Sequence, residues 1–305
     1  IATKRAVSFG GPIDHSAQFS PDGRTVAVVR QTRGVMEYVL HESASGQQRV
    51  KLDHVPGPRR EGCFSPDGRF IVIQTSYGAV RGKRPPGAGV YDTASGKLVR
   101  QLETGGNVWC ASVSPDSCTA ATASEDGTIL LWDLATVQPS DNAADINDKL
   151  WAHLASDAVT AYRAVVRLGR AGEHGAAFLR AKLKPAVPVD VKKLNTLFRD
   201  LGDERYAVWQ KAAADLADLD CGEVILRERL KVATNAESRR VISKMLEGYD
   251  GWLTIPHELR RVRAVEAMER NGTPAARKLL QEWAAGDAAS LLTREAKSAL
   301  ERKQP

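Results

Sequence analysis

The hydrophobic pattern of the chain changes near residue 137. Before it, short apolar runs rich in β-branched residues alternate with turns rich in Pro, Asp and Gly. Such runs bounded by turn residues are typical of β-strands. After it, apolar residues recur every three or four positions, which is the period of an amphipathic helix. The pattern therefore predicts a β-sheet half followed by a helical half.

A repeat organises the first half. Residues 19–24 read FSPDGR and recur as FSPDGR at 64–69, and a degraded copy, VSPDSC, occupies 113–118. Pro fixes φ, Asp bonds nearby backbone and Gly accepts a positive φ, so this motif predicts a tight turn. A hydrophobic strand is expected directly after each copy, at 25–29, 70–73 and 119–123.

Each copy continues with a second strand and a polar turn. After the first two copies a final strand follows, at 48–52 and 98–102. The serines of the three copies are 45 and 49 residues apart. Four short strands per unit at this period are typical of the blades of a β-propeller.

Residues 124–133, SEDGTILLWD, resemble the core of a WD-repeat blade. In that family a Ser or Thr, an Asp and the Trp are joined by side-chain hydrogen bonds. The resemblance assigns this structural motif to Ser124 or Thr122, Asp126 and Trp132, with Asp133 completing the Trp-Asp pair. The Gly-His pair of the family does not occur, and the first two copies lack the Trp. The related TolB-like propellers also carry Ser-Pro-Asp-Gly turns.

The repeats predict about three four-stranded blades and one additional strand. Residues 1–11 resemble the closing strand and exit loop of a preceding blade. Propellers need at least four blades to close. We therefore expect either the last part of a propeller from a larger protein or an open arc, whose free blade edge would favour self-association.

The second copy contains an insertion between two of its strands. Residues 79–89, AVRGKRPPGAG, form a basic loop rich in Pro and Gly. Loops on a rigid scaffold often carry binding residues. Arg81, Lys83 and Arg84 are therefore candidate contacts for an acidic partner, and the alternative is a solvated loop without a binding role.

The second half is predicted to be helical. Residues 137–148 are polar and form a linker, and an apolar stripe follows that would cover one face of a helix, at Trp151, Leu154, Ala158, Tyr162, Val165 and Leu168. Further helices are expected at 175–183, 189–201, 204–218, 222–233, 237–248, 257–270, 274–285 and 293–302.

Capping residues support these helices. Thr273 is an expected N-cap with Pro at the next position, which is the preferred order at a helix start. Gly272 and Gly286 stand where helix ends need a positive φ. Thr293 is expected to start the last helix, with Leu292 before it as a hydrophobic staple.

Residues 261–269 and 272–280 resemble a HEAT-type helix pair, and 203–212 resemble the first helix of another. Such pairs stack into arcs because a single pair cannot bury its apolar face. Taken together, the chain resembles bacterial WD-repeat proteins with a helical tail. The resemblance implies a multidomain β + α protein, with propeller blades over 1–136, a linker over 137–148 and an all-α HEAT-like domain over 149–305.

Composition narrows the function classes. The 305 residues carry a net charge of +6, with 15 Lys and Arg against 13 Asp and Glu before Pro139 and 28 against 24 from there on. This even spread disfavours a nucleic-acid partner, which would normally require clustered basic residues. No apolar run approaches the roughly 20 residues of a membrane span. We expect a cytoplasmic protein.

Catalytic motifs are missing from the sequence. There is no GxSxG elbow and no HExxH pair, and residues 94–98, ASGKL, lack the glycine and the hydroxyl of a phosphate loop. The four cysteines and six histidines show no metal-ligand spacing. We therefore expect neither cofactor nor metal, and a non-catalytic scaffold or adaptor for protein partners. The alternatives are the C-terminal regulatory region of a larger signalling enzyme and a nucleic-acid-binding helical domain.

Overall fold

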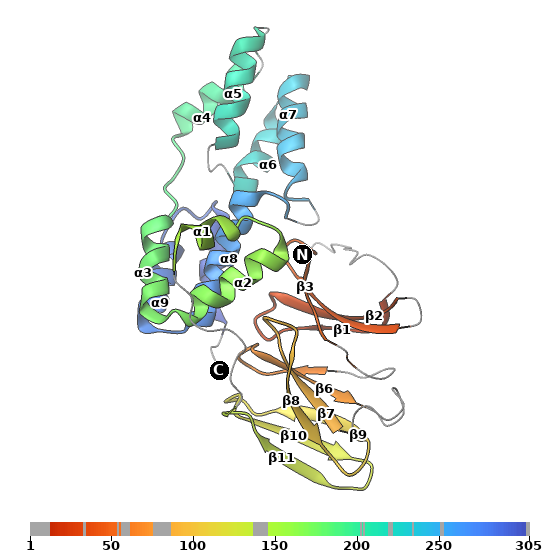
Figure 1. Ribbon diagram of the computed structural model, residues 1–305. Helices are drawn as coiled ribbons and strands as arrows, with labels where there is room; N and C mark the ends of the chain where they lie inside the picture. The colour runs from red at the N-terminus through yellow and green to blue at the C-terminus, as the bar shows by residue number, and fades with distance from the viewer. Residues whose placement is uncertain are drawn as a thin grey trace. The chain divides into compact units, whose positions relative to one another are not determined.

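The computed structural model describes residues 13–32, 35–53, 55, 62–75, 87–136, 146–201, 203, 205–218, 222–233, 235–250 and 253–302. Antiparallel sheets form the first part of the chain and helices the rest (Figure 1). The chain divides into two compact units, one formed mainly by Ser8–Arg167 and the other mainly by Leu168–Arg302. The expected domain boundary within 137–148 stays a prediction.

Three antiparallel sheets form the first unit, each with its strands in chain order. The first sheet contains β1 (Ile13–Phe19), β2 (Thr25–Thr32), β3 (Val35–Glu42) and β4 (Gln48–Lys51). The second contains β5 (Gly62–Phe64), β6 (Phe70–Thr75), β7 (Gly87–Asp92) and β8 (Leu98–Glu103). The third contains β9 (Val108–Val113), β10 (Thr119–Ser124) and β11 (Ile129–Asp133). The strands expected after each turn motif are confirmed, and the third sheet has three strands within the described residues.

The repeated turn motif works through its serine. In the first sheet the Ser20 hydroxyl donates to the Asp22 carboxylate at 2.5 Å and accepts from the Thr25 amide at 2.9 Å. The corresponding bonds recur in the other two sheets, where Ser65 and Ser114 occupy the same position. Each serine thus ties the turn to the first residue of the next strand, which explains why these strands begin where the sequence predicts.

The third copy of the turn differs at one residue. The first two turns place Gly23 and Gly68 at φ of 69° and 67°, whereas Ser117 adopts φ of 60° at the same position of the third. A side chain in this left-handed region is strained. Its hydroxyl, however, accepts a hydrogen bond from the Asp67 amide of the second sheet at 3.1 Å. The degraded motif therefore keeps the turn and adds a link between two sheets.

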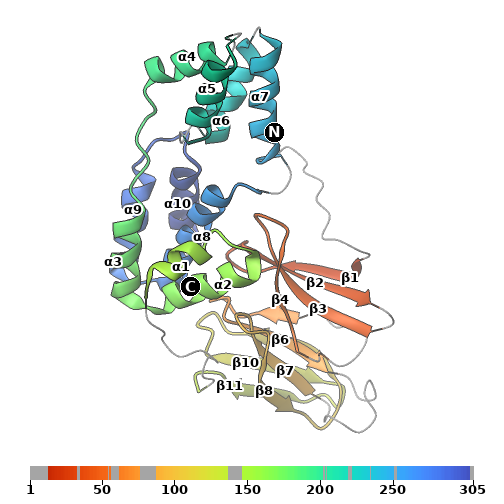
Figure 2. The ribbon, with the colours of Figure 1, turned by 45° about the horizontal axis from the view of Figure 1, so that its top comes forward.

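The second sheet lies between the first and the third, as both ribbon views show (Figures 1 and 2). On one side a hydrophobic core joins it to the third sheet, and this core contains Phe70, Val72, Val90, Leu102, Ala120 and Leu134. On the other side the Asp53 amide donates to the Gly96 carbonyl at 2.8 Å. Gly96 has a φ of 73°, and a Cβ there would lie 2.4 Å from the Lys51 carbonyl oxygen. A glycine is therefore required at this contact.

Two helices stand where one was expected from the apolar stripe. They are α1 (Asp148–His153) and α2 (Ala158–Arg170), so the prediction of one helix through this stripe is wrong. Asp157 provides the reason, because its carboxylate accepts hydrogen bonds from the Val159 and Thr160 amides at 3.0 Å each and starts a new helix. The apolar period continues across the break and therefore conceals it.

The remaining helices belong to the second unit. They are α3 (Gly172–Lys182), α4 (Val191–Asp200), α5 (Tyr206–Asp218), α6 (Gly222–Val232), α7 (Ala236–Glu247), α8 (Pro256–Asn271), α9 (Pro274–Ala284) and α10 (Leu291–Glu301). Each of the eight expected helices exists, with ends shifted by at most three residues. Helices α3, α8, α9 and α10 pack together. A separate core is shared by the four helices α4, α5, α6 and α7 and contains residues such as Leu197, Leu216 and Ile242.

Some of the expected caps are confirmed and others are wrong. Thr273 caps α9 by accepting from the Ala276 amide at 3.2 Å, and Gly272 has a φ of 65°. Gly286 is not among the glycines with positive φ. A Cβ there would lie 2.8 Å from the Thr293 hydroxyl, so close packing is what requires this glycine. Thr293 itself is buried inside α10, whose N-cap is Ser290. Leu292 therefore lies within the helix and does not precede it.

Candidate interaction surface

The tryptophan of the third sheet is held by one side-chain hydrogen bond. The Trp132 indole nitrogen donates to the Thr122 hydroxyl at 2.9 Å, between the adjacent strands β10 and β11. Thr122 is fully buried, and Trp132 packs against the core shared with the second sheet. Of the two candidates that the sequence left open, Thr122 makes this bond. Ser124 is also buried, and its hydroxyl has no hydrogen-bond partner within the described part of the chain.

The two aspartates of the motif lie at the ends of β11. Asp126 accepts from the Thr128 amide at 2.9 Å and from the Thr128 hydroxyl at 2.6 Å. These bonds, the hydroxyl's first, lower the pKa of its carboxyl group. Asp133 accepts from the Ala135 amide at 2.8 Å. Both carboxylates are exposed and stabilise turns, and neither bonds the Trp132 indole in any interaction that the structure gives.

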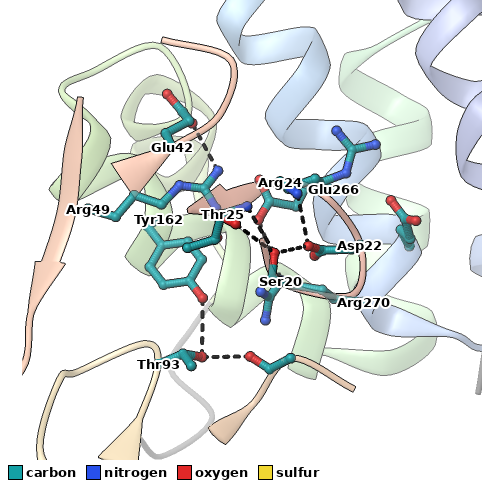
Figure 3. A network of polar contacts seen from close by, with 12 residues as sticks. Ser20, Asp22, Arg24, Thr25, Glu42, Arg49, Thr93, Tyr162, Glu266 and Arg270 are labelled. Atoms are coloured by element: carbon teal, nitrogen blue, oxygen red, sulfur yellow. Dashed lines mark hydrogen bonds and ion pairs between the residues drawn. The ribbon is translucent and has the colours of Figure 1, made fainter. Parts of the chain in front are cut away.

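The position of Asp133 is occupied differently in the first sheet. Its counterpart Glu42 is one methylene longer and forms a buried ion pair with Arg49 at 3.0 Å, each side chain being 2% exposed. Arg49 also donates to the Thr25 hydroxyl at 2.9 Å and lies 4.6 Å from the centre of the Tyr162 ring (Figure 3). These partners together compensate the buried charge, so this cluster fixes the outer strand β4 and has a structural role.

Tyr162 connects α2 to the sheets. Its hydroxyl donates to the Thr93 hydroxyl of the second sheet at 3.3 Å (Figure 3). Thr93 in turn donates to the Gly68 carbonyl at 2.7 Å. The Ala158 amide at the start of the helix donates to the Gln47 side chain of the first sheet at 3.2 Å. The first two sheets are thereby tied to one helix.

The equivalent face of the third sheet is more exposed. Ala27, Val72 and Ala121 each lie seven residues after the turn serine of their own sheet. Their partners on the neighbouring strand are Leu40, Val90 and Leu131, which therefore occupy equivalent positions. The side chains of Leu40 and Val90 are 0% exposed, whereas Leu131 is 73% exposed. The next position on the same face repeats the contrast, with Tyr38 at 3%, Ala88 at 0% and Ile129 at 69%.

We call the outward side of the third sheet the open face. It consists of the residues that point away from the second sheet in the ladder of β9, β10 and β11, namely Cys110, Ser112, Thr119, Ala121, Ala123, Ile129, Leu131 and Asp133. Trp109, which is 70% exposed, adjoins it at a register shift of β9. Along its outer edge, β11 pairs with no strand of the described residues. An apolar face beside a free strand edge is typical of an interaction site.

The charge around the open face differs from that of the whole chain. Residues 104–136 contain no Lys or Arg and four acidic residues, Asp116, Glu125, Asp126 and Asp133. The chain as a whole carries a net charge of +6. A partner of this face would therefore be favoured by basic residues at its rim.

Two further candidate regions are the basic segment that contains Lys83 and a cleft in the second unit. Arg81, Lys83 and Arg84 lie in residues that the structure does not describe. In the second unit, a cleft of about 310 Å³ is lined by residues including Phe198, Arg229 and Val232. The Arg229 guanidinium covers the Phe198 ring at 5.3 Å, so this cation is already engaged.

The cysteines and acidic groups give no sign of chemistry. Cys63, Cys110 and Cys118 are free thiols. Burial raises the pKa of the Cys63 thiol to about 11. Within the described ranges, no group of His, Cys, Asp and Glu could hold a metal ion, and no helix is long and apolar enough to cross a bilayer.

Sequence reasoning missed the exposed residues of the open face. Ile129 and Leu131 follow the same alternation as the buried residues of the other sheets, so their pattern predicts a core position. The available signal was the lack of a final strand after the third copy, where strands follow the first two at 48–52 and 98–102. The missing strand signal indicates an uncovered edge, but it does not identify the side chains that are exposed there.

Comparisons with known proteins agree with the repeat. The model of the family described as WD domain, G-beta repeat matches residues 96–133, and no curated protein matches the chain. Among solved structures, hydrazine synthase of Kuenenia stuttgartiensis is similar at 17% identity and a TM-score of 0.33, over 45% of this chain and 37% of that one. The chain thus carries a WD40 repeat that spans β8 to β11.

Proposed function

We propose that the chain is a non-catalytic scaffold or adaptor that binds protein partners through the open face. One observation carries this proposal: Ile129 and Leu131 are 69% and 73% exposed at positions that are buried in the other two sheets. WD40 repeats generally mediate protein–protein interaction, and one is present at 96–133. The side chains that such a repeat normally uses to pack on a neighbour are here free to bind another molecule.

The proposal extends to the architecture. We interpret the three sheets as consecutive blades of a propeller of the bacterial WD-repeat type. The helices after the predicted linker would form a HEAT-like array with a second binding surface. The basic residues Arg81, Lys83 and Arg84 would supply further contacts, and the protein would act in the cytoplasm. Residues 87–89 of the expected loop belong to strand β7 and are buried.

The energetics favour the open face as the main anchor. Burying a large apolar side chain contributes roughly 1.5–3 kcal/mol. Ile129 and Leu131 are neighbours on one face of β11, and Trp109 lies on β9 across the intervening β10, so a partner that spans the three strands would contact all of them. Aromatic and aliphatic residues clustered at the centre of an interface commonly dominate its binding energy.

Site-specific photocrosslinking tests the proposal. A benzophenone amino acid replaces Leu131 in the full chain, and a matched variant carries it at Val187, which is 77% exposed in the other unit. We expect the Leu131 probe to form defined protein adducts in cells, and Ile129→Asp to remove them. Adducts no more abundant than those of the Val187 probe would contradict the proposal.

A further inference from the structure

Three helices of the second unit each place a hydrogen-bond donor at one cleft. The cleft has a volume of about 310 Å³, and its lining includes Arg199 of α4, Arg229 of α6 and Ser238 of α7. The core shared by α4 to α7 holds these helices together. Among the described lining residues none is acidic, so the polar part of the cleft is positively charged.

Arg229 is oriented by two contacts that use only part of its guanidinium group. The guanidinium carbon lies 5.3 Å from the centre of the Phe198 ring, and Nη2 donates to the Asn195 side chain. Both partners belong to α4. A guanidinium carries several further N–H donors in one plane, and those of Arg229 meet no acceptor within the described part of the chain. The group is therefore fixed in advance, with donors left for an anion.

Ser238 adds a hydroxyl that lines the same cleft. The residue is 6% exposed, and its hydroxyl has no hydrogen-bond partner among the residues that the structure describes. Its backbone amide donates to the Asn235 side chain at 3.2 Å, which caps the start of α7. Burying a hydroxyl without a partner costs free energy, so this group points to a ligand that accepts from it. The helix start contributes a partial positive charge nearby.

The rest of the cleft wall is apolar. It consists of Phe198, Val232, Ala233 and Ile242. Ile242 is 1% exposed and belongs to the core, whereas Val232 is 67% exposed and remains accessible. A purely ionic ligand would leave this wall uncovered. The volume is at the lower end of the range of small-ligand pockets, roughly 300–1,000 Å³, so the cleft suits one or two side chains.

We propose that this cleft binds a phosphorylated serine or threonine of a partner protein together with an apolar residue beside it. The proposal rests on the proposed function and identifies the chemistry of one partner. A phosphate monoester carries nearly two negative charges and three acceptor oxygens, which match donors from three helices. A carboxylate has one charge and two oxygens and would leave one of these donors unpaired. Arginine clusters are a recurrent means of binding phosphorylated segments.

Arg199 is available to such a ligand despite its present partner. Its Nη2 donates to the carboxylate of the adjacent Asp200 at 3.1 Å, and the two side chains are 76% and 28% exposed. An ion pair as exposed as this contributes little in water. A phosphate group, with more charge and planar pairing to the guanidinium, forms the stronger bond.

An amide NMR titration of the full chain tests the proposal at the cleft. The probe is an end-blocked phosphoserine–leucine dipeptide, compared with its unphosphorylated form, a glutamate–leucine dipeptide and inorganic phosphate. We expect the phosphorylated dipeptide to shift the Ser238 amide and to bind at least about tenfold more tightly than the other three, since each lacks either the charge or the apolar group. Equal binding of any comparison ligand, or no shift at all, would overturn the proposal.

Matched arginine variants test the donors. Arg199→Gln should weaken binding of the phosphorylated dipeptide at least about tenfold. Arg205→Gln is the control, because Arg205 is also 76% exposed, pairs with the nearby Asp203 and is not a lining residue. Its affinity should be unchanged, and equal affinities of the two variants would overturn the proposal.

Ser238→Ala tests the buried hydroxyl with little risk to folding, because the backbone bond to Asn235 remains. The loss should be about threefold or more, and unchanged binding would contradict the assigned site. Displacement of the dipeptide by single-stranded DNA at a lower concentration would assign the cleft to nucleic acid and overturn the proposal. If no dipeptide binds but the Leu131 probe still forms protein adducts, the scaffold function survives without this cleft, so the two failures are distinguishable.

Discussion

The second and third sheets share a strand order and a turn motif, but their surroundings differ. Val90 and Ala88 of the second sheet are 0% exposed, and Leu131 and Ile129 at the same positions of the third are 73% and 69% exposed. The local pattern is equally apolar in both. Burial in a repeated architecture therefore depends on whether a neighbouring unit is present, since one unit cannot bury its own faces.

The three sheets also differ in their outer strands. In the first sheet β4 is fixed by a buried ion pair, and in the second β8 contributes Leu102 to a core. The third sheet has no such strand within the described residues. The sheets that are complete are thus also the ones that are covered, and the incomplete sheet is the one that presents apolar side chains.

The largest expected effect is at the outer strand of the first sheet. Arg49→Met removes the ion-pair partner of the buried Glu42 carboxylate, which should lower the free energy of unfolding of this unit by about 3–5 kcal/mol. Lys231→Met is the control, because the Lys231–Glu228 pair is 68% and 66% exposed and should contribute under about 1 kcal/mol. Exchange of the slowest amides of the first sheet measures the Arg49 variant, and exchange of the slowest amides of α6 measures the Lys231 variant. A loss at Arg49 no larger than the control would show that β4 is held by other contacts.

Leu40 and Leu131 occupy equivalent positions in the first and third sheets, so the same substitution can be compared at both. Leu40→Ala removes a fully buried side chain and should cost about 2–5 kcal/mol. Leu131→Ala should change the stability of the dilute chain by no more than about 0.5 kcal/mol, as is usual for exposed positions. Exchange of the β2 and β10 amides compares the two variants. Similar losses in both would mean that the open face is covered in the isolated chain.

Thiol reactivity compares the covered and uncovered faces directly. With a pKa of about 11, only about one Cys63 thiol in a thousand is ionised at pH 8. Since the neutral thiol is favoured by burial, its alkylation should accelerate about tenfold per pH unit up to about pH 11. Cys110 is exposed and should be labelled by iodoacetamide at pH 8 at least about a hundredfold faster. Mass spectrometry of labelled peptides reports both rates, and equal rates would contradict the covered position of Cys63.

The smallest expected effect is within the third sheet itself. Trp132→Phe removes the indole donor and leaves the buried Thr122 hydroxyl unpaired, and Thr122→Val removes the acceptor. A double-mutant cycle should give a coupling energy of about 0.5–1.5 kcal/mol for their hydrogen bond. A coupling near zero would mean that Trp132 holds the third sheet by packing alone.

Local chemistry made much of the fold predictable. The Ser-Pro-Asp turns place the start of three strands because their hydrogen bonds join residues within five positions of one another. Thr273 and Gly272 mark helix ends for the same reason. The break between α1 and α2 was missed because the apolar period runs through it, and only the cap at Asp157 interrupts the helix.

Tertiary contacts account for the remaining differences. Gly286 is required by the approach of Thr293, which lies on a different element. The alternating pattern predicts that Ile129 and Leu131 are buried. That burial requires another sheet or partner to pack on the open face. A single sequence reports what a residue is suited to contact, and the structure shows whether that contact exists.

Amide hydrogen exchange along β11 tests the central claim most directly. The full chain is compared with the Leu131→Asp variant, in dilute and in concentrated solution. The account predicts that β11 exchanges much faster than β3 and β7 in the dilute chain, and that a strand or partner that covers the open face slows it in the unsubstituted chain alone. Protection of β11 equal to that of β7 in the dilute monomer would contradict the account, because the third sheet would then already be complete.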